Sequence, residues 1–282
     1  MAGFELPAGR PAVMAILNVT PDSFSDGGKF LDPAAAVEHG LRMMEEGADL
    51  VDVGGESTRP GADPVPNEVE LERTVPVVDA LCRSGVPVSI DTSKAEVAEA
   101  CLGVGASVVN DVTGVSTTEM LAVLLRSNCH VCVMHMQGDP RTMQAAPTYA
   151  DVVADVASWL ADRCCVLETG GVARERLWID PGIGFGKTFE HNLALIGNLD
   201  RIVTLGYPVL VGLSRKSFLG TALGGASVED RLEGGLAAQV IAQYLGARIV
   251  RTHDPLQTRR AAEVASQVVS ASAVLGRTGS LR

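Results

Sequence analysis

The sequence predicts a single (β/α)₈ barrel, with eight parallel strands alternating with helices around one axis. Eight short apolar runs are separated by helix-length segments, and each run ends in Asn, Asp, His, Lys or Arg. Glycine follows three of the predicted helices and precedes the next apolar run, as in Gly47, Gly85 and Gly105. Alternation of this kind specifies a parallel sheet, and eight repeats favour its closure into a barrel. The pattern alone leaves six or nine repeats open.

Each predicted element has a local reason. The strands are predicted over 12–18, 49–53, 86–91, 106–110, 129–134, 175–180, 208–213 and 248–252. The helices are predicted over 33–46, 67–84, 94–104, 117–127, 149–171, 190–204, 228–246 and 255–274. Asp32 before Pro33 is typical of an N-cap residue followed by a first-turn proline. The three glycines stand where helices end in a left-handed residue.

Length and composition suit one barrel domain. The chain has 282 residues, somewhat above the ~250 typical of this fold. Its 46% hydrophobic and only 4% aromatic content predicts a core of Val, Leu, Ile and Ala, as barrel interiors prefer. We expect an N-terminal extension over 1–11, a catalytic domain over 12–275 and a disordered tail over 276–282.

The charge balance and the absence of long apolar runs exclude several function classes. Lys and Arg total 23 against 34 Asp and Glu, a net charge of −11, so a broad nucleic-acid-binding face is not expected. No stretch reaches the ~18 consecutive apolar residues of a membrane span. The first eleven residues lack the pattern of a secretory signal. We therefore expect a cytoplasmic protein with neither a nucleic-acid nor a membrane partner.

The six cysteines are expected to be reduced structural thiols. Cys129 and Cys132 form a CxxC pattern, which can indicate a metal or redox pair. Residues three apart in a strand point to opposite faces, so these two thiols would not share a ligand. A second CxxC that would complete a four-thiolate zinc site is also missing.

Three polar residues close predicted strands at the barrel mouth, where the strand ends converge. They are Asp91, Asn110 and Asp180. Each could simply cap the following helix. Together they favour a site that reads hydrogen-bond donors, because a carboxylate accepts two bonds from an amino and ring N–H edge, as in guanine or a pterin. An amide such as Asn110 can both donate and accept.

An anion site is predicted beside them. Arg251 and His253 stand two apart on the last strand and should share one face. Lys216 and Ser217 follow the seventh strand, and loops after strands 7 and 8 often bind phosphate in this fold. Arg215 could instead belong to a solvated charge cluster and point away. Asn18 offers a neutral oxygen for Mg²⁺, which takes few protein ligands besides substrate phosphate oxygens.

The loops add further candidates. The segment 182–188, GIGFGKT, misses the phosphate-binding-loop spacing, because Pro181 stands where the first glycine is needed. Its glycines instead favour a tight turn past a flat ligand, with Phe185 beside it. Arg59 could grip a carboxylate or phosphate with two hydrogen bonds. The long polar loops over 20–31 and 58–67 are typical of mobile lids.

At these residues the chain resembles the dihydropteroate synthase family. The matching stretches are 17–28, 51–61, 89–92, 134–138, 179–187, 214–217 and 251–254. The resemblance implies condensation of 6-hydroxymethyl-7,8-dihydropterin diphosphate with p-aminobenzoate, giving 7,8-dihydropteroate and pyrophosphate in folate synthesis. The departures are small: Thr252 stands where the family often has Val, and Gly235 where Thr is common.

The resemblance also implies roles for individual residues. The pterin pocket would comprise Asp91, Asn110, Asp180, Lys216 and Arg251. The p-aminobenzoate site would comprise Thr58, Arg59, Phe185 and Ser217. The diphosphate would be held by Asn18, Arg251 and His253, with Asn18 also binding the cofactor Mg²⁺. Asp26, from the first loop, would join Lys216, Arg251 and His253 in catalysis, and Phe24 would act from the same loop. The partners would be these small-molecule substrates and a second copy in a homodimer, through helices late in the barrel.

Three alternatives remain at this point. A methyltetrahydrofolate-binding domain of cobalamin-dependent methyltransferases would share the pterin readers but needs neither loop motif nor the Ser214–Ser217 motif. A non-catalytic paralogue would bind a pterin without converting it. An aldolase-like barrel would use Lys216 for a Schiff base, which needs a desolvated site, whereas Lys216 neighbours Arg215 and the predicted anion pocket.

Overall fold

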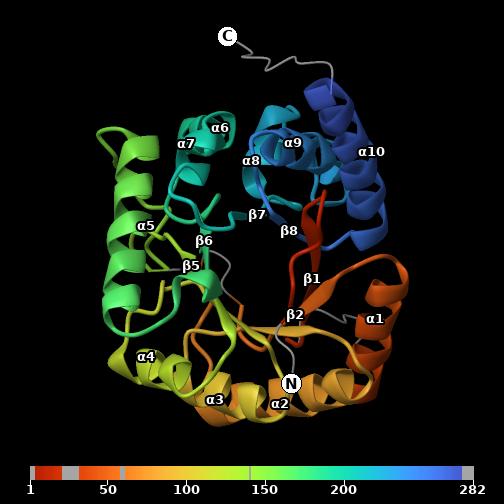
Figure 1. Ribbon diagram of the computed structural model, residues 1–282, viewed down its shortest axis with the longest axis vertical. Helices are drawn as coiled ribbons and strands as arrows, with labels where there is room; N and C mark the ends of the chain where they lie inside the picture. The colour runs from red at the N-terminus through yellow and green to blue at the C-terminus, as the bar shows by residue number, and fades with distance from the viewer. Residues whose placement is uncertain (1–3, 21–31, 58–60, 140, 275–282) are drawn as a thin grey trace.

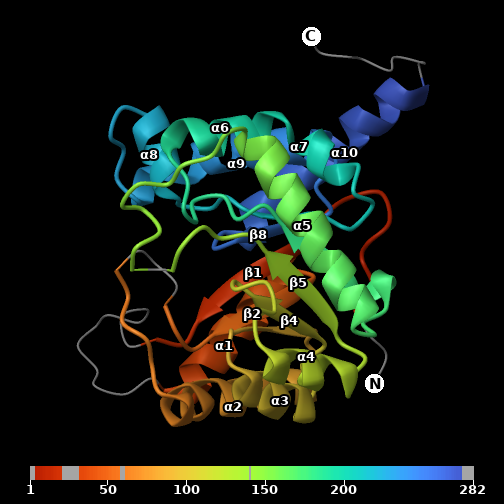
Figure 2. The same cartoon turned by 90° about the vertical axis from the view of Figure 1, so that its left-hand side faces the viewer.

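The computed structural model describes residues 4–20, 32–57, 61–139 and 141–274, with side chains described as far as Ala271. Its eight strands are all parallel and follow the order β6-β5-β4-β3-β2-β1-β8-β7. A bridge between Ile179 and Val209 links the two ends of this sheet. The helices lie around the strands (Figures 1 and 2). The predicted (β/α)₈ barrel is confirmed.

The strands lie within a few residues of their predicted ranges. They are β1 Ala12–Asn18, β2 Leu50–Gly54, β3 Val88–Asp91, β4 Val108–Asp111, β5 His130–Met134, β6 Leu177–Asp180, β7 Leu210–Gly212 and β8 Ile249–Thr252. The polar residue that ends each predicted run therefore stands at the end of a strand or just beyond it.

Helices fill the intervals between strands. They are α1 Pro33–Glu45, α2 Asn67–Arg83, α3 Ala95–Gly103, α4 Thr118–Leu125, α5 Val152–Thr169, α6 Phe189–Gly197, α7 Leu199–Val203, α8 Ser217–Ala222, α9 Leu232–Tyr244 and α10 Pro255–Val274. Short 3₁₀ turns span Arg174–Arg176 and Glu229–Arg231. Among the described residues, no helix is both long and apolar enough to cross a membrane.

Two helix predictions were wrong in detail. The segment predicted as one helix over 190–204 is two helices, because Asn198 leaves helical geometry (φ −123°, ψ 30°). The short helix α8 lies where no helix is predicted. The predicted boundaries of α1 hold: the Asp32 side chain accepts a hydrogen bond of 2.9 Å from the Ala34 N–H, and Gly47 follows with φ 102°.

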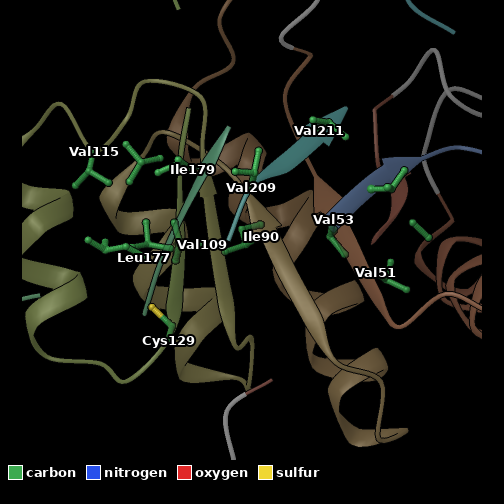
Figure 3. Close-up of a cluster of buried hydrophobic side chains, with 14 of the residues drawn as sticks. Val51, Val53, Ile90, Val109, Val115, Cys129, Leu177, Ile179, Val209 and Val211 are labelled. Atoms are coloured by element: carbon green, nitrogen blue, oxygen red, sulfur yellow. The ribbon is translucent and has the colours of Figure 1, made fainter. Parts of the chain in front are cut away.

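The apolar core has two layers, separated by the barrel wall. The outer layer fills the space between strands and helices, as Figure 3 shows for side chains such as Val51, Ile90 and Val109. The inner layer lies inside the barrel and consists of Ala12, Met14, Leu50, Val108, Cys132, Trp178, Leu210 and Ile249. Cys129 belongs to the outer layer and Cys132 to the inner one. This confirms that the CxxC thiols point to opposite faces, and all six cysteines are free thiols.

The N-terminal end of the barrel interior is closed by aromatic rings. Trp178 is fully buried, and the His130 ring stacks on it with centroids 5.1 Å apart. Phe4, from the segment before β1, meets the edge of the same indole at 6.0 Å. The next inward-facing residue along each strand lies one step nearer the mouth, so the polar side chains there rest on an apolar floor.

We predict that Trp178→Ala destabilises the fold strongly, because removing a fully buried indole leaves a cavity that the rigid barrel cannot close. The free energy of unfolding should fall by about 3–5 kcal/mol, measured by urea denaturation followed by circular dichroism. Val166→Ala, at an exposed position of α5, should change it by less than about 0.5 kcal/mol. A loss of less than about 1 kcal/mol for Trp178→Ala would show that this floor is not part of the core.

Candidate active site

A buried ion-pair network occupies the barrel mouth. The Arg251 guanidinium binds two carboxylates, with Nε 2.6 Å from Asp52 Oδ2 and Nη2 2.6 Å from Asp91 Oδ2. Asn110 Nδ2 donates to the same Asp52 oxygen at 3.1 Å. The predicted residues Asp91, Asn110 and Arg251 are thus brought together, with Asp52 at their centre.

Asp52 was not among the predicted site residues. The alternation of side chains along a strand could have identified it. Asp52 stands two residues after the inner-layer Leu50 on β2, so its side chain must face the barrel interior. It is fully buried. A carboxylate in that position requires a cation, and Arg251 supplies it.

Unused hydrogen-bonding capacity remains around this network. Asp52 Oδ1, Asp91 Oδ1 and Ser89 Oγ are buried and have no hydrogen-bond partner within the described part of the chain. Burial raises the pKa of Asp91 above its ordinary value, against the opposing effect of Arg251. Because such atoms are costly to leave unpaired, the site is suited to a ligand that donates hydrogen bonds.

The second half of the site surrounds Asp180. Its Oδ1 accepts a hydrogen bond of 2.7 Å from the Gly182 N–H. Burial raises the pKa of Asp180, while the charges of Lys216, Lys187 and Arg251 oppose that rise. This carboxylate therefore lies among three cations.

None of the three predicted donor-reading residues caps a helix. The N-cap residues of the helices that follow Asp91, Asn110 and Asp180 are Lys94, Thr117 and Thr188. The capping interpretation is therefore wrong for all three residues, and their side chains remain available to the barrel mouth.

Lys216 points from the start of α8 toward the segment after β6. Its ammonium donates to the Ile183 carbonyl and lies 4.6 Å from the centroid of the Phe185 ring. Burial lowers the pKa of Lys216 to about 8. Arg215 has a left-handed backbone (φ 59°) and turns away, with Nη2 2.6 Å from Asp254 Oδ1. The expectation that Arg215 could point away is confirmed.

A buried pair that the sequence analysis missed lies beside Asp180. Lys187 Nζ is 3.1 Å from His135 Nδ1, and both side chains are buried. Burial lowers the pKa of Lys187 to about 7. Burial, followed by the charge of Lys187, lowers the pKa of His135 to about 3. The available signals were the lysine that ends the glycine-rich segment and the histidine that ends the fifth apolar run.

The candidate anion residues lie at the ends of β1, β7 and β8. A Cβ on Gly54 would make ordinary contacts with Asp91 Cβ at 3.6 Å and with Asn18 Oδ1 and Asp91 Oδ2 at 3.7 Å, so these two oxygens lie close together beside this glycine. His253 Nδ1 lies 3.1 Å from Ser214 Oγ, which fixes the imidazole near the end of β7. Ser217 is exposed at the first residue of α8.

Four other candidates lie outside the described residues: Phe24 and Asp26 in the first loop, and Thr58 and Arg59 in the second. The two described ends of that second loop are joined by Lys94. Its Nζ lies 2.5 Å from Glu56 Oε2, the Val65 carbonyl and Glu70 Oε2. The base of the loop is therefore held closed beside β3.

Comparison with known proteins identifies the family. Residues 14–253 match the family model described as "Pterin binding enzyme". The dihydropteroate synthase of Escherichia coli K12 is 46% identical over 270 residues, covering 95% of each chain. The dihydropteroate synthase of Xanthomonas albilineans, solved with 4-aminobenzoic acid, has a TM-score of 0.84 and 43% identity, covering 96% of this chain and 94% of that one. The enzyme of Burkholderia cenocepacia, solved with 7,8-dihydropteroate, has a TM-score of 0.86 and 42% identity, covering 96% of each.

We predict that His135 makes the fold acid-sensitive. Its folded-state pKa of about 3 lies below the ~6.5 of an unfolded histidine, so its contribution to stability is complete above about pH 6.5 and is lost as the pH falls toward 3. The loss approaches about 1.4 kcal/mol per pH unit. The free energy of unfolding of His135→Asn, which keeps an acceptor for Lys187, should fall less steeply than that of the wild type between about pH 6 and 4. Equal slopes would show that His135 does not stay neutral.

Proposed function

The chain belongs to the dihydropteroate synthase family, and on that premise we propose how its site carries out the reaction. The reaction joins 6-hydroxymethyl-7,8-dihydropterin diphosphate to p-aminobenzoate and releases 7,8-dihydropteroate and pyrophosphate. The observation that carries the assignment of the site is the convergence of Asp91, Asn110 and Asp180 around one arginine at the barrel mouth. The product complex of the B. cenocepacia enzyme supports the chemistry.

The pterin ring is read by buried acceptors. A pterin presents an amino group beside a ring N–H, and a carboxylate accepts both hydrogen bonds. Asp180 is the carboxylate we assign to this edge, because Lys216 and Arg251 favour its ionised form. Asn110 can donate and accept at another edge. Arg251, held in plane by Asp52 and Asp91, presents a flat guanidinium that can lie against the ring.

The diphosphate is placed at the ends of β1 and β8. Arg251 and His253 share the inner face of β8 and can bind phosphate oxygens there. Asn18 contributes one neutral oxygen next to Gly54, close to Asp91 Oδ2. Among the described residues no group of three or more His, Cys, Asp or Glu side chains forms a metal cage. One protein oxygen plus phosphate oxygens fits Mg²⁺, which would supply charge neutralisation to the leaving diphosphate when bound.

The bond changes balance without a strong base. The C–O bond between the pterin methylene carbon and the diphosphate breaks, and the electron pair leaves with pyrophosphate. The neutral arylamine of p-aminobenzoate forms the new C–N bond and then loses one proton to solvent. Arg251 and His253 stabilise the developing negative charge on the leaving oxygens.

The arylamine substrate is assigned to the side of the mouth that Phe185 and Ser217 border, with Thr58 and Arg59 from the second loop and Asp26 from the first. Closure of the two loops would keep water from the methylene carbon before the amine attacks. Lys216, between Phe185 and Asp180, lies where the two substrates meet.

We also propose that the enzyme works in the cytoplasm, because its six cysteines are all free thiols and one of them, Cys165, is exposed.

A homodimer is proposed through the outer face of α9 and α10. These helices lie side by side (Figure 1), tied by Gln243 Nε2, which donates to the Ala262 carbonyl at 3.0 Å. Their exposed apolar residues are Ile241 and Tyr244 on α9 and Val264 and Val268 on α10. Spacings of three and four residues place each pair on one face of its helix. Exposed apolar residues on two neighbouring helices are typical of a protein interface.

The proposed function is tested by incubating the protein with the pterin diphosphate, p-aminobenzoate and Mg²⁺ while following dihydropteroate and pyrophosphate together. We predict equal amounts of both products. Asp180→Ala should weaken binding of a pterin ligand by roughly 100-fold or more, because buried charge-assisted hydrogen bonds are lost. Asp162→Asn, on the exposed face of α5, is the matched control. Pterin binding without turnover would identify a paralogue or methyl-carrier domain, and no pterin binding would overturn the proposal.

For the dimer, we predict that the double variant Ile241→Glu, Val264→Glu is monomeric, because two carboxylates would be buried without partners at the interface. Light scattering after size-exclusion chromatography should give twice the chain mass for the wild type and one chain mass for the variant. Val166→Glu, at an exposed valine of α5, should leave the dimer intact. A monomeric wild type would refute this interface.

A further inference from the structure

The loop between β6 and α6 has every carbonyl from Ile183 to Gly186 held by a side chain. The donors come from three different segments of the chain. They are Lys216 to Ile183, Gln144 to Gly184 at 2.6 Å, Lys187 to Phe185 at 2.9 Å, and Tyr149 to Gly186 at 2.7 Å. Four donors on four consecutive carbonyls fix this loop far more tightly than a surface turn needs.

The loop also lies directly against the segment after β5. Gly182, Gly184 and Gly186 all have left-handed backbones, with φ of 67°, 85° and 62°. A Cβ on Gly182 would overlap the His135 carbonyl, and one on Gly186 would overlap the Gln137 carbonyl. The glycines therefore allow two backbones to touch, and a side chain placed between them holds both.

Lys187 is that side chain. Its buried ammonium lies 2.9 Å from the Phe185 carbonyl, 3.1 Å from His135 Nδ1 and 3.4 Å from the His135 carbonyl. The three protons of an ammonium match these three acceptors. His135 Nδ1 must then be unprotonated, so the imidazole is neutral and carries its proton on Nε2.

This arrangement is electrostatically expensive for a purely structural contact. No carboxylate within the described residues is hydrogen-bonded to Lys187, and Asp180 acts on it only through space. An apolar side chain of similar length would avoid the desolvation cost. However, an apolar side chain at this position would leave the Phe185 carbonyl and His135 Nδ1 without a hydrogen-bond donor. The segment that carries the Phe185 ring would then no longer be held in place.

We propose that Lys187, supported by neutral His135, is a positioning residue that holds Phe185 against Lys216 and thereby shapes the p-aminobenzoate side of the mouth. The inference rests on the proposed function in assigning p-aminobenzoate to the Phe185 side. Lys187 acts through the Phe185 backbone and does not itself touch either substrate. The pterin readers Asp91 and Asn110 belong to β3 and β4, away from this loop. Asp180 adjoins the loop, but it keeps the Gly182 N–H and the charges of Lys216 and Arg251 when Lys187 is replaced.

The first test separates the two substrates. In Lys187→Met the KM for p-aminobenzoate should rise roughly 10- to 100-fold, the effect of misplacing a contact by about 1 Å, while the Kd for the pterin diphosphate changes less than about threefold. Lys187→Gln, whose amide can still donate to the Phe185 carbonyl, should recover part of that loss. Arg126→Met, which breaks an exposed ion pair on α4, is the control. Unchanged KM, or an equal loss for both substrates, would overturn the proposal.

A second test does not depend on turnover. The protein is labelled with 4-fluorophenylalanine, and the Phe185 signal in the ¹⁹F NMR spectrum is assigned by its loss in Phe185→Leu. We expect this signal to shift or broaden in Lys187→Met and to stay in place in Arg126→Met. An unmoved signal would overturn the positioning role. A moved signal in a protein that makes no dihydropteroate would instead leave the positioning of Phe185 intact and refute the proposed function.

Discussion

The contact between Arg251 and the two carboxylates of Asp52 and Asp91 is the constraint on which the site depends. Two buried carboxylates and a partly buried guanidinium meet at one end of a barrel whose opposite end is filled with apolar side chains. Removing Arg251 would leave two buried carboxylates without their cation, and breaking a buried ion pair in this way typically costs about 3–5 kcal/mol. The network therefore ties β2, β3 and β8 together at the point where the inner layer of apolar side chains ends.

Strand parity explains why this network can exist. Alternate residues of each strand face the barrel axis, so Leu50 is followed by Asp52, Trp178 by Asp180 and Ile249 by Arg251. The apolar residue of each pair forms the floor of the mouth, and the polar residue two positions later lines the site. Glycine takes the polar step on β7, where a Cβ on Gly212 would stand 3.8 Å from Arg251 Cβ. Lys216 Nζ lies 3.9 Å from the same position, so the absence of a side chain at Gly212 lets Arg251 and Lys216 approach this part of the mouth.

Features with a local or periodic cause could be predicted from the sequence, whereas those decided by three-dimensional contacts could not. Strand ends and helix boundaries at Asp32 and Gly47 were predictable because each has a local cause. The role of Asp52 was missed because its significance depends on Arg251, 199 residues away. Lys187 was missed for a related reason. A lysine in a glycine-rich segment can have several roles, and only its contact with His135, which is distant in the sequence, shows which role applies. The short helix α8 carries no periodic signal in six residues.

The charged groups in the two halves of the site explain how it can accept the anionic substrate of the family. The site contains three carboxylates, Asp52, Asp91 and Asp180, and three cations, Arg251, Lys187 and Lys216. Burial raises the pKa of Asp91 and Asp180 and lowers the pKa of both lysines, so each of these four groups is driven toward its neutral form. A diphosphate brings negative charge into this environment and favours the charged form of each lysine. Both ammonium groups already donate to backbone carbonyls of the loop after β6, Lys187 to Phe185 and Lys216 to Ile183, so the diphosphate stabilises positive charge that the fold has already oriented.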